Sequence, residues 1–277
     1  MASFTTTTAA KFIPEIWSKE VILARESRLY MANLIMRLDT DVEDMGNKIH
    51  LPNVSNLTAS NIGSDGSLTD SAPTETEVVL TLSSWKGVSI NVPDIVMAQS
   101  KYDLPKLYAE KMGYALALIV EQDLLGQYNS LSGSYTVGTS GVDITDATLL
   151  AGIQKLDENR APFEERELVI KPSQKKALLQ IDKFVRYDSV PYAKGESPVV
   201  KGNLGNIYGV SIHVSPEVAG PSPTKNLLFQ HDAFALAMQK DVMVEKFART
   251  AFANRIGASE LYGFAILRDD HAVQVVS

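Results

Sequence analysis

The sequence GNLGNIYGVSIHVSP, residues 202–216, carries the strongest local signal for the fold. Three glycines, Gly202, Gly205 and Gly209, punctuate it, and apolar residues alternate with polar ones after the last glycine. This order predicts tight turns that lead into a short, half-buried strand. A dinucleotide-binding loop or a P-loop would place its last glycine before a helix. Because a strand follows here, the motif indicates a fold element rather than a phosphate site.

The composition is that of an ordinary globular protein. The chain has 277 residues, of which 45% are hydrophobic and 21% charged, enough for a substantial core in one or two domains. Its net charge is −7, and its lysines and arginines are scattered, so it lacks the basic footprint of a tight nucleic-acid binder. It contains no cysteine, which excludes disulfides, thiolate nucleophiles and cysteine-based zinc sites.

Neither a signal peptide nor a membrane span is predicted. The first ten residues are small and threonine-rich, without the basic start and apolar centre of a signal peptide. The longest apolar stretch, Met112 to Val120, is much shorter than the about 20 residues that span a bilayer. We therefore expect no membrane association and a product that stays in the cytoplasm where it is made.

Two helices are expected in the first half of the chain. After an extended tail over residues 1–12, residues 14–37 read as an irregular helix of a docking arm, with Pro14 in its first turn. The clearest helix covers residues 103–127, with Asp103 as its cap and Pro105 in its first turn. It is apolar nearly all round at its centre, which predicts burial on several sides. Glu121, Gln122 and Asp123 should return it to solvent.

A compact α+β unit is predicted over residues 143–216. Thr145 caps an amphipathic helix, residues 167–170 form a strand, and Pro172 begins another helix. Residues 184–201 read as a loop before the glycine-rich strand. The last two strands, residues 262–267 and 272–276, are expected to form a hairpin around Asp269 and Asp270 and to pair beneath the long helix.

A long polar hairpin is predicted over residues 46–93. Strands are expected at 48–52, 78–82 and 88–92. Between the first two lies Ser55 to Glu77, rich in Ser, Thr, Asn, Asp and Gly. So long a polar connection is uncommon in a compact domain unless it is functional. We therefore expect it to reach onto a neighbouring subunit.

The order of these motifs resembles that of tailed-phage major capsid proteins of the Hong Kong-97 type. The resemblance rests on the Gly-x-Leu-x-Gly-x-x-Ile-like strand at 202–214, on LLFQHDAFALA at 227–237 and on IPEIWS at 13–18, and it extends over nearly the whole chain. It implies an α+β fold with five parts. These are an N-terminal arm (1–45), an extended loop (46–93), a peripheral domain with a long spine helix (94–142), an axial domain (143–223) and return strands of the peripheral domain (224–277).

The resemblance also implies a function. The chain would assemble with itself into pentamers and hexamers and close into an icosahedral shell around a double-stranded DNA genome, without sequence-specific DNA binding. It would use a portal and a separate scaffolding protein, because no long charged helical extension precedes Ile13. Assembly would take place in the host bacterial cytoplasm, and the product would be part of the virion.

The sequence supplies no convincing catalytic, cofactor or metal motif. The four histidines (His50, His213, His231, His271) are far apart, whereas metal ligands cluster. The acidic run Asp39, Asp41, Glu43, Asp44 fails as a calcium loop, because Asp44 and His50 stand where Gly and Glu are needed. Ser173 begins a Ser-x-x-Lys sequence at a helix start, where capping or exposure explains it better. The carboxylates Glu164, Glu165 and Glu167 are best interpreted as polar residues at the start of a strand.

Three aromatic residues are candidates for contacts between subunits. Trp17 and Tyr30 lie in the predicted arm, and Trp85 flanks the predicted loop. Large aromatic side chains often anchor interfaces, although burial in the subunit's own core would equally explain the tryptophans.

Two other functions stay open at this point. An encapsulin-type compartment would keep the fold and enclose enzymes instead of DNA. A small α+β hydrolase or ligand-binding protein would instead use a pocket in residues 143–216, and the missing catalytic motif counts against it.

Overall fold

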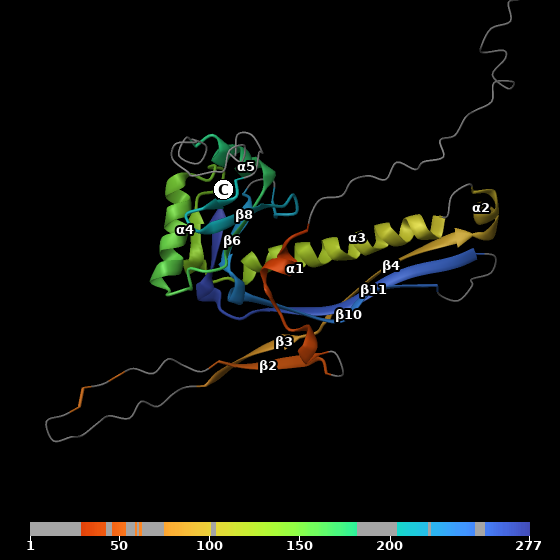
Figure 1. Ribbon diagram of the computed structural model, residues 1–277, viewed down its shortest axis with the longest axis horizontal. Helices are drawn as coiled ribbons and strands as arrows, with labels where there is room; N and C mark the ends of the chain where they lie inside the picture. The colour runs from red at the N-terminus through yellow and green to blue at the C-terminus, as the bar shows by residue number, and fades with distance from the viewer. Residues whose placement is uncertain are drawn as a thin grey trace, which may run out of the picture.

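The computed structural model describes residues 29–42, 46–53, 59, 61–62, 75–100, 104–181, 204–220, 223–246 and 253–277. Within these ranges the strands form a four-stranded sheet, a six-stranded sheet and a two-stranded hairpin. The four-stranded sheet and the long helix α3 (Leu104–Leu125) extend together from the six-stranded unit (Figure 1). The hairpin projects from the side of the four-stranded sheet that α3 does not cover (Figure 1). The mixed α+β architecture is the predicted one.

The four-stranded sheet has the order β1-β10-β11-β4. Its centre is the antiparallel pair β10 (Phe234–Lys246) and β11 (Ala253–Ile266). Strand β4 (Ser84–Pro93) pairs antiparallel with β11, and the short β1 (Met36–Arg37) pairs parallel with β10. Helix α2 (Asp94–Gln99) follows β4 and leads toward α3.

Helix α3 covers one face of this sheet, as expected for the predicted long helix. Met112 and Leu116 pack against β4 and β11 in a cluster that also contains Val92, Ile256 and Ala258. Successive side chains of a strand point to opposite faces. The residues that alternate with this cluster therefore define the outer face of the sheet, namely Trp85, Gly87 and Ser89 of β4 and Arg255, Gly257, Ser259 and Leu261 of β11.

The six-stranded sheet has the order β5-β12-β9-β6-β8-β7. Its strands are β5 (Thr136–Gly138), β6 (Arg166–Ile170), β7 (Asn206–Ile207), β8 (Val210–Val214), β9 (Lys225–Gln230) and β12 (Ala272–Val276). Helices α4 (Asp146–Glu158) and α5 (Pro172–Leu179) begin where the sequence predicts. The Thr145 hydroxyl accepts a hydrogen bond from the Thr148 N–H, and Leu149, Leu156 and Leu178 enter the core of this unit.

The predicted C-terminal hairpin is wrong. Strand β11 pairs with β10 and β4, whereas β12 pairs with β9 and β5 in the other sheet. The 3-10 turn η6 (Asp269–His271) takes the chain from the four-stranded sheet into the six-stranded sheet instead of reversing it within one sheet. Four of the five β12 residues are buried, which suits a central strand covered on both faces. The five-part domain division stays a prediction, although β5, β9 and β12 join the sheet of the predicted axial unit.

The predicted N-terminal helix does not continue to Arg37. Helix α1 covers only Met31–Leu34, and Met36–Arg37 form the strand β1. Pairing with β10 overrides the helix propensity of this segment, because it satisfies the backbone in the sheet. The predicted helical residues 14–28, the cap Asp103 and the predicted loop 184–201 lie outside the described residues.

The predicted hairpin is present at its root. Strands β2 (Lys48–Asn53) and β3 (Thr76–Thr81) pair antiparallel over their full length, and the predicted third strand is β4. Most of residues 54–74 lie outside the described residues. Short 3-10 turns complete the structure: η2 (Asp39–Asp41), η3 (Gly126–Ser130), η4 (Gly133–Tyr135) and η5 (His231–Ala233). The last of these begins at His231 and leads directly into the buried start of β10.

Candidate assembly surfaces

The glycine motif forms a tight hairpin between β7 and β8. Tyr208 and Gly209 both have positive φ, 53° and 81°, as two-residue hairpin turns of the I′ type require. Gly205 also has a positive φ of 61°, and Gly202 lies outside the described residues. Gly209 leads directly into β8, so the prediction that the last glycine opens a strand is confirmed.

The start of the described chain is held to α3 by a buried carboxylate. Glu121 Oε2 accepts hydrogen bonds from the backbone N–H of Tyr30 (3.0 Å) and of Met31 (2.8 Å). The side chain is only 1% exposed, so the predicted return of α3 to solvent at Glu121 is wrong. Burial raises the pKa of this carboxyl, although the two N–H groups act in the opposite direction.

The Tyr30 side chain contacts its own subunit. Its ring centroid lies 5.0 Å from that of His213, and His213 Nε2 lies 2.7 Å from Glu167 Oε2. The carboxylate of Glu167 in β6 therefore contacts His213 of the neighbouring strand β8 and is not paired with Glu164 or Glu165. A role of Tyr30 between subunits stays a prediction.

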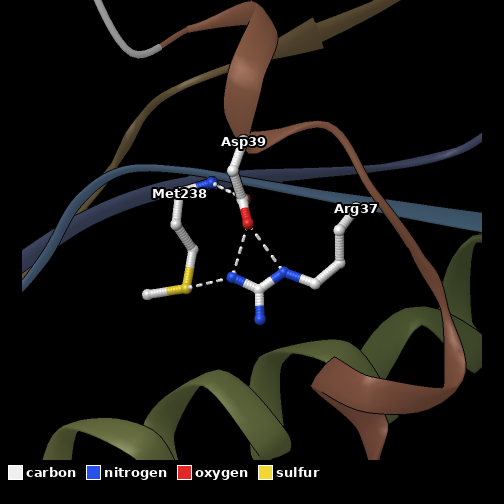
Figure 2. Close-up of polar contacts among 3 residues, drawn as sticks. All are labelled: Arg37, Asp39 and Met238. Atoms are coloured by element: carbon white, nitrogen blue, oxygen red, sulfur yellow. Dashed lines mark hydrogen bonds and ion pairs between the residues drawn. The ribbon is translucent and has the colours of Figure 1, made fainter.

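A second contact fixes the chain after β1. Figure 2 shows Arg37, Asp39 and Met238 together. Asp39 Oδ2 lies 2.7 Å from Arg37 Nη2, and Asp39 Oδ1 accepts a hydrogen bond of 2.8 Å from the Met238 N–H. Asp39 of the acidic run thus ties η2 to β10, while Glu43 and Asp44 of that run lie outside the described residues.

The hairpin root crosses the outer face of the four-stranded sheet at Gly263. A Cβ at this position would overlap the carbonyl oxygen of Thr81 and lie 2.9 Å from its carbonyl carbon. Leu80 and Leu82 are buried there in a cluster with Leu38 and Val42. The root is therefore packed on the body, whereas β2 and β3 point away from the sheet toward the lower left of Figure 1.

Trp85 lies on the same outer face and is open to solvent. Its side chain is 77% exposed, and its strand position pairs with Leu261. Burial in the core of its own subunit, the alternative left open by the sequence, does not occur. Trp17 lies outside the described residues, so its role in subunit contacts stays a prediction.

The described residues show no clustered chemistry. His50 pairs with Glu77 at 3.0 Å, His231 lies 3.2 Å from the Leu34 carbonyl oxygen, and His271 is buried. No group of three His, Asp or Glu side chains among the described residues could hold a metal ion. Ser173 is exposed on the first turn of α5. None of the described helices is both long enough and apolar enough to span a bilayer.

The fold is that of known phage capsid structures. A chain of Mycobacterium phage Che8 superposes with a TM-score of 0.82 at 22% identity, covering 95% of this chain and 97% of the other. The capsid structure of cyanophage P-SCSP1u gives a TM-score of 0.77 at 19% identity, covering 97% and 94%. The mature capsid of bacteriophage PhiM1 gives 0.74 at 16% identity, covering 95% and 91%. No curated protein gives a significant match to the chain.

The sequence itself identifies the family. The family described as phage capsid protein matches residues 76–273, which is more than half of the chain. The chain belongs to this phage capsid protein family and has the predicted Hong Kong-97-type fold. It is a major capsid protein, the class that forms the phage head shell.

Proposed function

We propose that the chain assembles with itself into pentamers and hexamers that close into an icosahedral shell around double-stranded DNA. The observation that carries this proposal is the family match over residues 76–273, together with a fold shared along nearly the whole chain with phage capsid structures. The role is structural rather than catalytic, in keeping with that family.

Two features of the subunit support assembly through several contacts at once. The hairpin β2–β3 extends from the body on a root that is packed against the sheet (Figure 1), and the outer face beside the root exposes Trp85. Each subunit can thus both give and receive contacts. Closed symmetric assembly multiplies modest interfaces, so no single contact needs to be strong.

The partners of the shell follow from this role. We expect a separate scaffolding protein and a portal, and enclosed DNA that is not bound by sequence. The net charge of −7 supports a shell that DNA enters by packaging rather than by affinity for the wall. The shell would be assembled in the host bacterial cytoplasm and become part of the virion.

The first test is negative-stain electron microscopy of the chain expressed alone and together with its genomic neighbours. Closed shells, or pentamers and hexamers that close when a scaffolding protein is added, are expected. DNA content would separate a phage head from an encapsulin-type compartment, which would hold enzymes. A monodisperse monomer or dimer under both conditions would contradict the proposal.

The rival functions lack comparable support. A hydrolase or ligand-binding protein would need a catalytic or binding constellation in residues 143–216. The Glu167–His213 pair in this range is packed against Tyr30 of the same chain. The family match to phage capsid proteins favours the shell over both alternatives.

A further inference from the structure

A histidine is buried in the connection between the two sheets. His271 is the last residue of the turn η6, and only 7% of its surface is exposed. This turn takes the chain from β11 of the four-stranded sheet to β12 of the six-stranded sheet, and η5 takes it from β9 to β10. The two turns pack against each other. Residues 231–233 and 267–271, the sheet junction, therefore lie where any change in the relative position of the sheets must act.

Hydrogen bonds to two different elements hold the sheet junction closed. The Leu267 N–H donates to the Ala233 carbonyl oxygen at 2.8 Å, and the Arg268 N–H donates to the same atom at 3.2 Å. The side-chain amide of Asn159, the residue that ends α4, donates a hydrogen bond of 2.9 Å to the Asp270 carbonyl oxygen. The turn η6 is therefore held both by η5 and by the end of α4.

The buried ring of His271 has no partner for one of its two nitrogens. Nδ1 is inaccessible to water and forms no hydrogen bond with any described residue. A neutral imidazole carries one donor and one acceptor nitrogen, whereas the protonated ring carries two donors and a positive charge. Burying a donor without an acceptor is unfavourable, and burying an unpaired charge is more so. The closed sheet junction therefore favours the neutral ring.

Burial also outweighs the charged groups around the ring, and it lowers the pKa of His271 below its ordinary value of 6.5. Asp270 of η6 and Asp232 of η5 favour the protonated ring, whereas Arg268 beside η6 and Arg166 of β6 oppose it. Further charged or titratable side chains on elements that contact the junction are Asp157, Glu165, His231, Asp269 and Tyr135. The carboxylates of Asp270 and Asp232 thus attract a proton to the ring, but neither bonds Nδ1 while the junction is closed.

We propose that His271 is an acid-sensitive switch of the sheet junction, which is closed around the neutral ring and opens when the ring is protonated. In the opened junction, water or the carboxylate of Asp232 can reach Nδ1, so the ring binds a proton there with its ordinary affinity. As the pH falls below 6.5, the opened junction gains a proton that the closed junction does not bind, and the free energy of opening therefore falls.

The switch is a property of the single subunit. Its use in a shell, where acidification would let the two sheets change their relative position, rests on the proposed function. The switch and the shell can therefore be tested separately.

Hydrogen–deuterium exchange of the full chain as unassembled subunits tests the switch. Peptides that contain Leu267 and Arg268, whose N–H groups donate across the junction, are followed by mass spectrometry one pH unit above and one pH unit below 6.5. After division by the intrinsic exchange rate, protection of these amides should fall about five- to tenfold with acidification, as expected for one histidine that is protonated only in the opened junction. The amides of Leu116 and Val120 in α3 should exchange more slowly, because only opening of the whole subunit exposes them.

A glutamine variant separates the charge of the ring from its packing. In His271→Gln, which does not titrate at this position, the fall in protection should shrink to less than about twofold, whatever the absolute protection. The contributions of Glu121 and the other titrating groups are common to the wild type and this variant, so they cancel in the comparison. The matched control is His50→Gln, which removes an exposed histidine paired with Glu77 at the hairpin root and should keep the wild-type fall.

Titration of the histidine rings by nuclear magnetic resonance gives a second measurement. The ring of His271 in the wild type should take up its proton below pH 6.5. Its signals are assigned by elimination, with single glutamine variants at the other three histidines (His50, His213, His231). This titration decides the matter even where His271→Gln does not fold.

The outcomes separate the switch from the proposed function. An equal fall in the wild type and in His271→Gln, junction amides that exchange no faster than those of α3, or a His271 ring that titrates at pH 6.5 or above would overturn the switch. Normal shells from a chain without this pH effect would leave the proposed function standing. A pH-sensitive junction in a chain that never forms shells would support the switch and contradict the shell.

Discussion

Glu121 stabilises a contact between parts of the chain that are 90 residues apart. Its carboxylate accepts the N–H groups of Tyr30 and Met31 in a site with almost no exposure to water. An acceptor for two otherwise buried backbone donors matters because unsatisfied donors are costly, at about 1–3 kcal/mol each. The same burial raises the pKa of the carboxyl above its ordinary value of 4.5.

This raised pKa gives stability a defined pH dependence. Between the folded pKa and 4.5, the folded chain binds a proton at Glu121 that the unfolded chain has lost. The free energy of unfolding should therefore rise as the pH falls through this window. Compared with Glu121→Gln, which does not titrate, the wild type should gain stability on acidification. Urea unfolding of unassembled subunits at a series of pH values measures this, and a difference that does not vary with pH would contradict it.

Gly263 is predicted to be indispensable for the hairpin root. In Gly263→Ala the new methyl group would meet the backbone of Thr81, which cannot move without displacing β3. We expect a loss of about 1–3 kcal/mol in the free energy of unfolding. Gly113→Ala in α3 is the matched control, because its added Cβ meets no heavy atom within 4 Å apart from its chain neighbours and the backbone of its own helix. That variant should be stabilised by about 0.5–1 kcal/mol, since glycine is unfavourable within a helix. Equal effects of the two substitutions would refute the argument.

At the scale of elements, the hairpin separates folding from assembly. Its root contributes Leu80 and Leu82 to the core, whereas residues 55–74 lie between Asn53 and Thr76, the last paired residues of the two strands. Replacing residues 55–74 by a short Gly-Ser turn should leave the melting temperature of the subunit nearly unchanged and prevent normal shells. Circular dichroism and electron microscopy of the same preparation decide this. Shells of normal size and stability would show that the segment is dispensable.

Elements with a local cause could be predicted from the sequence. Helix α4 begins directly after its cap Thr145, and α5 begins at Pro172, because capping and proline geometry act within one turn. The strand character of Met36 and the burial of Glu121 could not be predicted, because both depend on partners about 90 to 200 residues away. The C-terminal hairpin failed for the same reason. An Asp-Asp turn between two apolar strands does not specify whether they share a sheet.

For the candidate surfaces, too, features with a local cause could be predicted from the sequence, and features that depend on distant residues could not. Trp85 was identified because a large aromatic residue flanks a polar loop. Lys240 and Arg255 were missed, because only pairing across β10, β11 and β4 brings them to the same face of the sheet as Trp85. The alternation of Trp85, Gly87 and Ser89 along one strand was the available signal, since small residues at every second position leave space beside a large one.

At the scale of the whole molecule, assembly should appear as added stability. A subunit held by several neighbours is stabilised by mass action, by about 4 kcal/mol when partners exceed the dissociation constant a thousandfold. For a chain of this size, shells should melt about 10 °C above unassembled subunits. Differential scanning calorimetry of both forms in the same buffer measures this difference. Identical melting temperatures would mean that the contacts between subunits are negligible.

The turns η5 and η6 connect the two sheets side by side. The Leu267 N–H donates to the Ala233 carbonyl oxygen at 2.8 Å, and the Arg268 N–H lies 3.2 Å from the same atom. Because the two connectors are hydrogen-bonded to each other, they restrict twisting of one sheet relative to the other more than bending between the sheets. Torsion of one sheet against the other would have to break these bonds, whereas bending about the line through both connectors would keep them. A subunit built in this way can bend between its two sheets, and so adjust the curvature of a shell, without twisting one sheet against the other.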